Sequence, residues 1–262
     1  MSTPGLLYAA GGALARITIS QPAKMNAMAF HMWQALPDLV ARAVADSQVR
    51  AIVLEGDGEK AFCAGADISQ FGDQRSDPAA VAAYDRAVAE GMAALAQAAK
   101  PTIAVIRGIC FGGGFGLALA CDIRLARADA RFRVPAARLG LGYGFDGVAL
   151  LARKLGPDAT ADILFSARIL DAGEAERLGV VAKVWPAETF AAEAGAYLDS
   201  VAANAPLTLL AAKAALMELS KPEAARNTAE VSRLVAACFG SADYKEGQAA
   251  FKEKRTPQFR GV

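Results

Sequence analysis

Apolar runs and amphipathic segments alternate along the first two thirds of the chain, as they do where buried strands are followed by helices. In chain order the pattern predicts a strand pair at 6–8 and 14–19, a helix at 27–46, a strand at 50–56, a helix at 78–99, a strand at 101–106, a short helix at 114–120, strands near 122–125 and 130–132, and a helix at 147–155. Gly11-Gly12 between the first two runs favours a hairpin turn. This alternation predicts an α/β core.

The last third of the chain lacks the strand pattern. After Pro186 the alanine-rich sequence predicts helices only, with breaks near Pro206 and Pro222. We therefore expect two parts: an α/β core over residues 1–195 and a helical region over residues 196–262.

Composition narrows the classes of partner. Lys+Arg number 28 and Asp+Glu number 27, so the chain has no overall attraction for nucleic acid or for an anionic membrane. The four cysteines form no C-x-x-C pair and there is one histidine, so no metal site is expected. Neither a signal peptide nor an apolar run of roughly 20 residues is visible, and we expect a reduced, cytoplasmic protein.

Three consecutive glycines, Gly112 to Gly114, follow a predicted strand and precede a predicted helix. In that position their backbone N–H groups would lie at a helix N-terminus, where unpaired donors and the helix dipole attract negative charge. The spacing matches neither a Walker loop nor a dinucleotide-binding turn. Close packing of a strand on a helix explains the glycines equally well.

A second loop, Cys63 to Ile68, is rich in small residues and also exposes backbone N–H groups. The alternative interpretation is an ordinary loop in which Asp67 caps a helix.

These loops belong to a set of segments with a characteristic spacing: QPAKMNAM at 21–28, AFCAGADI at 61–68, KPTIAVIRG at 100–108, GGG at 112–114, CDI at 121–123, DAGEAERLGVV at 171–181 and EGQAAFKEKR at 246–255. Together they resemble the enoyl-CoA hydratase/isomerase (crotonase) family over nearly the whole chain. The resemblance implies a core of stacked β-β-α turns and a C-terminal helical region that trimerises, giving a homotrimer or a dimer of trimers. It also implies an acyl-CoA thioester as substrate, with coenzyme A as part of that substrate and no permanently bound cofactor.

The resemblance further implies that the backbone N–H groups of Ala66 and Gly113 form an oxyanion hole for the thioester carbonyl. Removing one such donor typically costs about 3–4 kcal/mol of transition-state stabilisation. The implied contacts to coenzyme A are Lys24, Lys60, Ala64, Ala66 and Ile68, with Phe251 and Lys254 from a neighbouring subunit. For each lysine the alternative is an ordinary solvated charge.

The sequence departs from the family's hydratases at both catalytic carboxylates. The resemblance places their two glutamates where this chain has Gly116 and Ala136, and neither residue can transfer a proton. Asp146 and Tyr143, in a glycine-rich loop, are the candidates that remain. Asp146 alternatively serves as the N-cap of the helix predicted from Gly147, and Tyr143 alternatively packs.

Three functional hypotheses follow. The first is an enzyme, a lyase, isomerase or hydrolase that acts on an acyl-CoA through an enolate-type intermediate. The second is a catalytically silent acyl-CoA-binding protein of the same fold, and a purely structural subunit is a third possibility. Independently, residues 207–217 carry more apolar surface than one exposed face needs, which predicts an oligomer.

Overall fold

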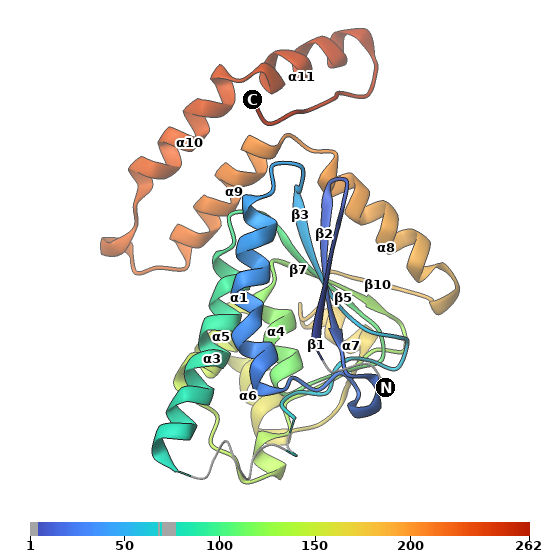
Figure 1. Cartoon of the computed structure of the whole chain (residues 1–262), viewed down its shortest axis with the longest axis vertical. Coiled ribbons are helices and arrows are strands. Elements are labelled where there is room, and N and C mark those ends of the chain that lie inside the picture. Colours follow the sequence, from blue (N-terminus) through green and yellow to red (C-terminus); the bar gives the residue numbers. More distant parts are fainter. Residues whose placement is uncertain (1–4, 68, 70–76) are drawn as a thin grey trace.

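The computed structural model describes residues 5–67, 69 and 77–262 and contains two β-sheets. The larger sheet has the order β1-β2-β3-β5-β7-β10, with β1 antiparallel to β2 and the other pairs parallel. Its strands are β1 (Gly5–Gly11), β2 (Leu14–Ser20), β3 (Ala51–Gly56), β5 (Thr102–Ile106), β7 (Ile123–Arg127) and β10 (Lys183–Trp185). Figure 1 shows this sheet at the centre of the molecule.

The smaller sheet consists of short strands, each of the first three of which follows a long strand of the larger sheet. Its order is β4 (Ala61–Cys63), β6 (Ile109–Phe111), β8 (Arg131–Arg133) and β9 (Leu170–Asp171). Long strand, short strand and helix therefore repeat as β3-β4-α3, β5-β6-α4 and β7-β8-α5. This repeat is the stacked β-β-α arrangement that the family resemblance implies.

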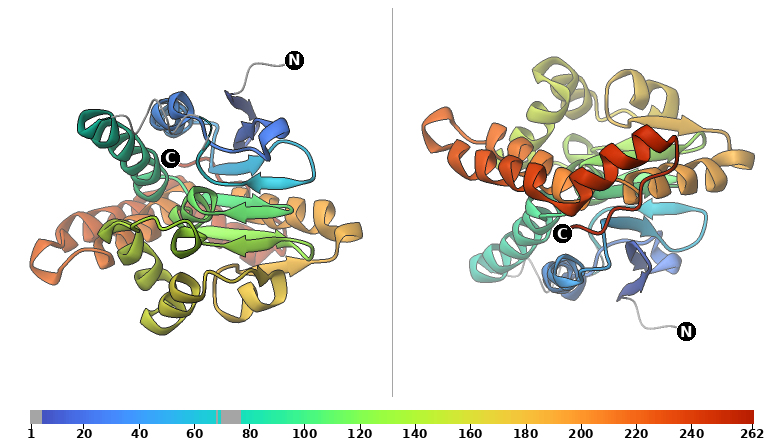
Figure 2. Two further views of the ribbon diagram at one scale, coloured as in Figure 1. Left: turned by 90° about the horizontal axis from the view of Figure 1, so that it is seen from below. Right: turned by 90° about the horizontal axis from the view of Figure 1, so that it is seen from above.

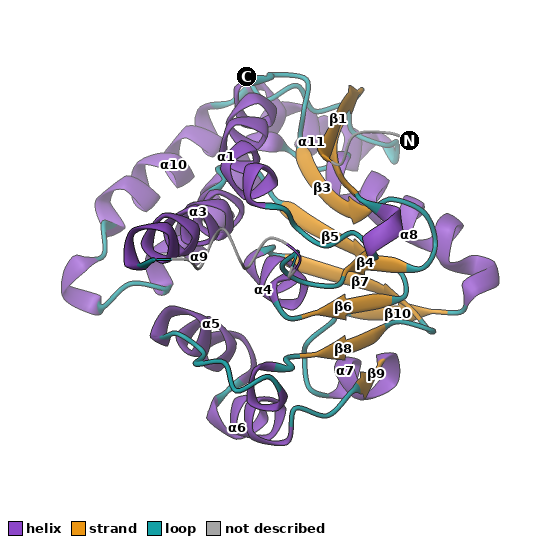
Figure 3. Cartoon of the chain, turned by 60° about the horizontal axis from the view of Figure 1, so that its bottom comes forward, coloured by secondary structure: helices purple, strands orange, loops and turns teal. Residues whose placement is uncertain are grey.

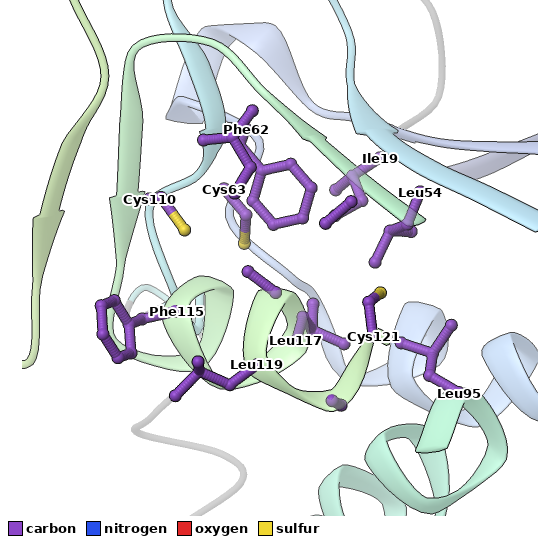
Figure 4. Packing of buried hydrophobic residues seen from close by; sticks show 14 of the residues in the cluster. Ile19, Leu54, Phe62, Cys63, Leu95, Cys110, Phe115, Leu117, Leu119 and Cys121 are labelled. Carbon is purple, nitrogen blue, oxygen red and sulfur yellow. The ribbon is translucent and has the colours of Figure 1, made fainter. Parts of the chain in front are cut away.

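Helices surround the two sheets (Figure 3). They are α1 (Phe30–Ala45), α3 (Pro78–Gln97), α4 (Gly113–Ala120), α5 (Phe145–Leu155), α6 (Pro157–Ser166), α7 (Ala172–Arg177), α8 (Ala187–Ala202), α9 (Pro206–Leu219), α10 (Thr228–Gly240) and α11 (Ala242–Glu253). Helix α4 is almost entirely buried, and its side chains pack with those of the surrounding strands in the main hydrophobic core (Figure 4).

The four helices after Pro186 agree with the predicted change of pattern. Seen from above, α9, α10 and α11 lie over one end of the molecule (Figure 2). Helix α10 has no buried residue. In the described part of the chain no single helix is long and apolar enough to cross a membrane, although α8 and α9, bent by 96° at their junction, reach that threshold as a pair.

Some boundaries differ from the prediction. The hairpin turn is Gly12-Ala13, because Gly11 still pairs with Leu14 at the end of β1. Strand β6 was not predicted, since its three residues Ile109–Phe111 are too few to show a period.

Three of the four cysteines are buried core residues, as predicted, and Cys238 is half-buried. Burial raises the pKa of the Cys63 thiol to about 12 and has the same effect on Cys121. These thiols stay protonated at neutral pH, so their role is packing.

Candidate active site

The two candidate loops follow neighbouring strands. Cys63 at the end of β4 pairs with Cys110 of β6, so the chain leaves both strands at the same edge of the small sheet. An ideal Cβ on Gly65 would lie 3.4 Å from the Gly113 nitrogen, and one on Gly113 would lie 3.6 Å from the Ala66 nitrogen. The loops are therefore in contact through their backbones.

Glycine is required at two of the three triplet positions for different reasons. Gly112 has φ +51°, a conformation that residues with a Cβ rarely adopt, and its N–H donates to Arg133 O at 2.8 Å. At Gly114 a Cβ would lie 2.3 Å from Cys63 O, which is inside van der Waals contact. The close-packing interpretation of the triplet is thus confirmed for Gly114, and it is compatible with ligand binding at Gly113.

Gly113 is the first residue of helix α4, with Gly112 as its N-cap. The first N–H groups of a helix have no partner within it. In the described chain no acceptor is found for the Gly113 N–H, whereas Gly116 N donates to Gly112 O at 3.1 Å. The N-terminus of a buried helix therefore presents a free donor next to the first loop.

The first loop is paired to residues 25–28 like a short strand. Ala64 N donates to Met25 O at 2.9 Å, and Asp67 N donates to Met28 O at 3.0 Å. Met28 N in turn donates to the carbonyl oxygen of Gly65 at 2.7 Å. In a strand, alternate N–H groups point to opposite sides. Ala66 N accordingly points away from Met28, and it has no acceptor among the described residues.

Asn26 fixes the segment that carries this pairing. Its side chain is buried (1% exposed), and its Nδ2 donates to Asp57 O at 2.9 Å and to Ala61 O at 2.7 Å. Its Oδ1 accepts from Gln21 N at 3.1 Å. Asn26 and Met25 both have left-handed φ values, 57° and 51°. Asparagine tolerates this region better than other residues with side chains, while at Met25 it stores strain.

An ion pair closes the far end of the loop. Lys24 Nζ lies 2.7 Å from Asp67 Oδ2 and 2.6 Å from Ser69 Oγ, and Asp67 is nearly buried. Burial opposes ionisation of Asp67, but hydrogen bonds from Lys24 and Ser69 outweigh it and hold its pKa below the usual range. The Asp67 carboxylate also accepts from Gln21 Nε2 at 3.3 Å and from the main-chain N–H of Ser69 at 3.1 Å, and the latter is the kind of bond that a helix cap makes. Most of the segment that such a cap would begin lies outside the described residues, so the role of Asp67 as a helix cap stays a prediction.

The place of the first hydratase glutamate is filled by another side chain. A Cβ on Gly116 would lie 2.6 Å from Met92 Cε and 3.4 Å from its Sδ. The thioether of Met92, from helix α3, therefore covers the face of α4 on which a carboxylate would stand. Ala136, at the place of the second glutamate, is half-buried in the 3-10 turn Ala136–Arg138.

Asp146 is exposed and lies in the first turn of α5, a helix that packs against α4. The N-cap of α5 is Gly144, so the prediction of Asp146 as N-cap is wrong, because the helix begins two residues earlier than expected. Tyr143 is half-buried, and a Cβ on Gly147 would lie 2.7 Å from its ring. Burial raises the pKa of the Tyr143 hydroxyl. Tyr143 therefore packs on the first turn of α5, and the catalytic role of either residue stays a prediction.

The predicted coenzyme A contacts fall into two groups. Near the first loop, Ala64 is half-buried, Lys60 is exposed and Lys24 is held by Asp67; Ile68 lies outside the described residues. Phe251, 87% exposed, and Lys254 lie at the end of α11, which Figure 1 places at the top of the molecule, apart from α4. That position agrees with a contact to another subunit, which stays a prediction.

Over the described ranges, no group of three or more His, Cys, Asp or Glu side chains is arranged to hold a metal ion. The free donors of Ala66 and Gly113 instead suit an oxygen atom on which negative charge develops.

Comparison with known proteins agrees with this arrangement. The sequence model of the enoyl-CoA hydratase/isomerase family matches residues 9–262, and the chain belongs to that family. A probable enoyl-CoA hydratase of Rhizobium meliloti is 35% identical over 263 residues, 99% of each chain. A crotonyl-CoA hydratase of Syntrophomonas wolfei subsp. wolfei is 34% identical over 247 residues, 94% of each chain.

The fold is likewise that of the crotonase family. A crystal structure of an enoyl-CoA hydratase/carnithine racemase from Magnetospirillum magneticum superposes with a TM-score of 0.92 at 33% identity, covering 100% of this chain and 97% of that one. A putative enoyl-CoA hydratase/isomerase family protein from Hyphomonas neptunium gives 0.90 at 36% identity, covering 97% of each.

Sequence reasoning missed two residues that border the site. Trp33 of α1 lies against Gly113, and Met92 of α3 lies against Gly116. Each belongs to an apolar helical pattern that predicts an ordinary core residue, so only the folded structure shows that it lies beside the site.

Proposed function

We propose that the protein binds an acyl-CoA thioester and stabilises its carbonyl as an enolate-type oxyanion between the N–H groups of Ala66 and Gly113. The observation that supports this most is the contact between the two loops, in which the N–H groups of Ala66 and Gly113 lack acceptors among the described residues. Preplaced donors of this kind stabilise a developing oxyanion because they need no reorganisation during the reaction. The names of the relatives, hydratases of enoyl-CoA or crotonyl-CoA, support a thioester as ligand.

The reaction proposed is a proton shift or related lyase chemistry that does not use two glutamates. Hydration needs one group to activate water and another to protonate the α-carbon. Gly116 and Ala136 supply neither, and Met92 fills the space beside Gly116 with an apolar group. An isomerisation needs a single base, for which Asp146 at the start of α5 is our candidate.

A second candidate, a silent acyl-CoA-binding protein, is favoured by the exposure of Asp146. A general base has to lie within hydrogen-bond reach of the proton that it removes, and the described residues of one subunit do not enclose this carboxylate together with a ligand. Assembly into trimers bears on this choice. A neighbouring subunit packed on α5 would cover Asp146 and the adjacent Phe145, which is 84% exposed, and would thereby favour the enzyme over the silent binder. We include a homotrimer or dimer of trimers in the proposal for this reason.

The test of the oxyanion site is the infrared spectrum of bound [1-¹³C]butyryl-CoA, measured against the unlabelled ligand. Two N–H donors on the thioester oxygen should weaken the C=O bond and move its stretch to lower frequency. Binding without that movement would contradict the proposal, and so would the absence of binding in calorimetry.

Two variants at position 113 separate the effect of the N–H group from the effect of added side-chain volume. Gly113→Pro removes the donor at the first helical position, where proline is tolerated, while Gly113→Ala adds a Cβ and keeps the donor. We expect the frequency change to persist in the alanine variant and to diminish in the proline variant. Turnover of a 3-enoyl-CoA that falls with Asp146→Ala would establish the enzyme over the silent binder.

A further inference from the structure

Trp33 carries a hydrogen-bond donor that the fold buries without an acceptor. Its side chain is 0% exposed on helix α1, and its Nε1 has no hydrogen-bond partner in the described structure. Buried polar groups in native proteins nearly always have hydrogen-bond partners, because a buried donor without an acceptor has lost its hydrogen bonds to water and has formed none in the protein. The indole N–H therefore needs an acceptor that none of the described residues provides.

The donor lies on the side of the indole that faces the candidate site. Ring atom Cζ2 would be 3.3 Å from a Cβ on Gly113, the same point that lies 3.6 Å from Ala66 N. On the other side of the ring, Cε3 would be 3.2 Å from a Cβ on Gly91 of α3. Cζ2 and Nε1 are both bonded to Cε2, so Nε1 belongs to the edge near the two free amides.

Met92 borders the same face of α4. Positions 113 and 116 are three residues apart and share one side of the helix, so the indole of Trp33 and the thioether of Met92 cover that side together. Gly91, against which the indole packs, directly precedes Met92 in the sequence. A methionine has three rotatable bonds and no branch, so it can give way to a ligand group. The side of α4 next to the Gly113 amide thus combines a movable apolar side chain, Met92, with one fixed donor, the indole N–H of Trp33.

We propose that Trp33 Nε1 donates a hydrogen bond to an oxygen on the acyl chain itself, beyond the thioester carbonyl, so that the site selects acyl-CoA esters carrying a keto or hydroxyl group near the thioester. This inference rests on the proposed function, in which the main-chain amides of Ala66 and Gly113 receive the thioester oxygen. A side-chain donor from another element adds a separate point of recognition. An analogue that lacks this oxygen still binds through the two amides, but more weakly, because the indole donor is then left unpaired.

The oxygen selected is neutral. Indole N–H is a donor only and carries no charge. Burying a carboxylate beside it would leave the charge unpaired, which costs more than one hydrogen bond returns. A 3-oxoacyl or 3-hydroxyacyl group fits these conditions, and a dicarboxylic acyl group does not.

Calorimetry with two matched ligands tests the inference on the full-length protein. Acetoacetyl-CoA carries the 3-oxo group, and butyryl-CoA is the same acyl chain without it. Trp33→Phe keeps a buried aromatic ring and removes the N–H. We expect the variant to bind acetoacetyl-CoA roughly threefold to tenfold more weakly and butyryl-CoA with little change, as the loss of one neutral hydrogen bond predicts.

A spectroscopic readout covers the case in which Trp33→Phe fails to fold. The chain has two tryptophans, so its ¹H–¹⁵N spectrum contains two indole signals, and Trp185→Phe identifies the one from Trp33. In that background, acetoacetyl-CoA should move the Trp33 indole proton downfield, and butyryl-CoA should leave it near its free position.

The outcomes separate the two proposals. Equal effects of both ligands on the Trp33 signal, or equal losses of affinity in Trp33→Phe, would overturn the role of Trp33 and leave acyl-CoA binding intact; a buried water on Nε1 would give that result. Binding of neither ligand to the wild-type protein would overturn the proposed function and this inference with it.

Discussion

Polar side chains hold the loop that contains Ala66 in place. The turn that contains Gly113 depends instead on two glycine positions at which a side chain would not fit. Asn26, Lys24 and Asp67 hold the first with hydrogen bonds and an ion pair. The second depends on Gly112, whose φ of +51° and ψ of −117° disfavour a residue with a Cβ, and on Gly114, where a Cβ would clash with the backbone of Cys63. One half of the site should therefore respond to polar substitutions and to pH, and the other to added volume alone.

The largest effect is expected from Gly114→Ala. The new Cβ would lie 2.3 Å from Cys63 O and 2.7 Å from Cys63 Cβ, and neither atom belongs to a flexible chain end. We expect the free energy of unfolding to fall by about 3 kcal/mol, at the upper end of the usual cost of overpacking, with loss of acyl-CoA binding. Chemical denaturation measures the first and calorimetry the second.

Gly195→Ala is the matched control, because a Cβ there meets nothing within 4 Å and α8 should gain helix propensity. If Gly114→Ala were as stable as this control, the second loop would not be held by close packing.

Asn26→Ala should come next, since it removes three hydrogen bonds from a buried position and leaves alanine at φ 57°. The expected loss of unfolding free energy is about 2–3 kcal/mol. Asn204→Ala deletes a single exposed side-chain bond to Ser200 O and should change stability by less than about 0.5 kcal/mol. Similar values for the two variants would show that the polar clamp is dispensable.

The ion pair gives a smaller effect that depends on pH. Lys24 is nearly half exposed, so Lys24→Met should cost only about 0.5–1 kcal/mol at pH 7. The pKa of Asp67 is lowered in the folded protein, so its contribution is present above the unfolded value of about 3.9 and is lost as pH falls through the folded value.

Denaturation of wild type and Lys24→Met at pH 7 and at about pH 3 measures this. The difference between them should shrink on acidification. A difference that is unchanged or larger at low pH would mean that Lys24 acts through something other than the charge of Asp67.

The smallest effect is expected from Gly116→Ala, which sharpens the comparison within one helix. Its Cβ would lie 2.6 Å from Met92 Cε, but this atom is the end of a flexible side chain, in contrast to the backbone beside Gly114. We expect a net cost of about 0.5 kcal/mol or less, because the gain in helix propensity offsets part of the overpacking, and Met92→Ala in the same chain should relieve that cost. A double-mutant cycle by denaturation gives the coupling, and no coupling would contradict the placement of Met92.

Much of the fold could be predicted because its elements are long enough to show a period. The helices at α1, α3 and α4 and the strands β2, β3 and β5 lie where the apolar pattern places them. Strand β6 and strand β9 have three and two residues, which carry no readable alternation. The start of α5 was misjudged because Asp146 has the chemistry of a cap, although Gly144 occupies that position.

The two main-chain loops of the candidate site could be predicted from the sequence, whereas the side chains that surround them could not. Glycines and small residues mark loops that can expose N–H groups, and the resemblance to the crotonase family indicated Ala66 and Gly113 within those loops. Asn26 bonds to residues 31 and 35 positions away, and this distance in sequence hides the clamp. An unpaired indole N–H cannot be inferred from a pattern, because Trp33 occupies an ordinary core position of its helix.

The two donors belong to the main chain at the ends of the adjacent strands β4 and β6, and this has an evolutionary consequence. Mutation can replace every side chain around them without deleting either donor, so the anchoring of a ligand and the chemistry performed on it can diverge independently. Positions 116 and 136 illustrate this freedom: the glycine and the alanine found there cannot move a proton, while the two amides lie adjacent. A lineage built on this scaffold can therefore change its reaction before it loses its ligand.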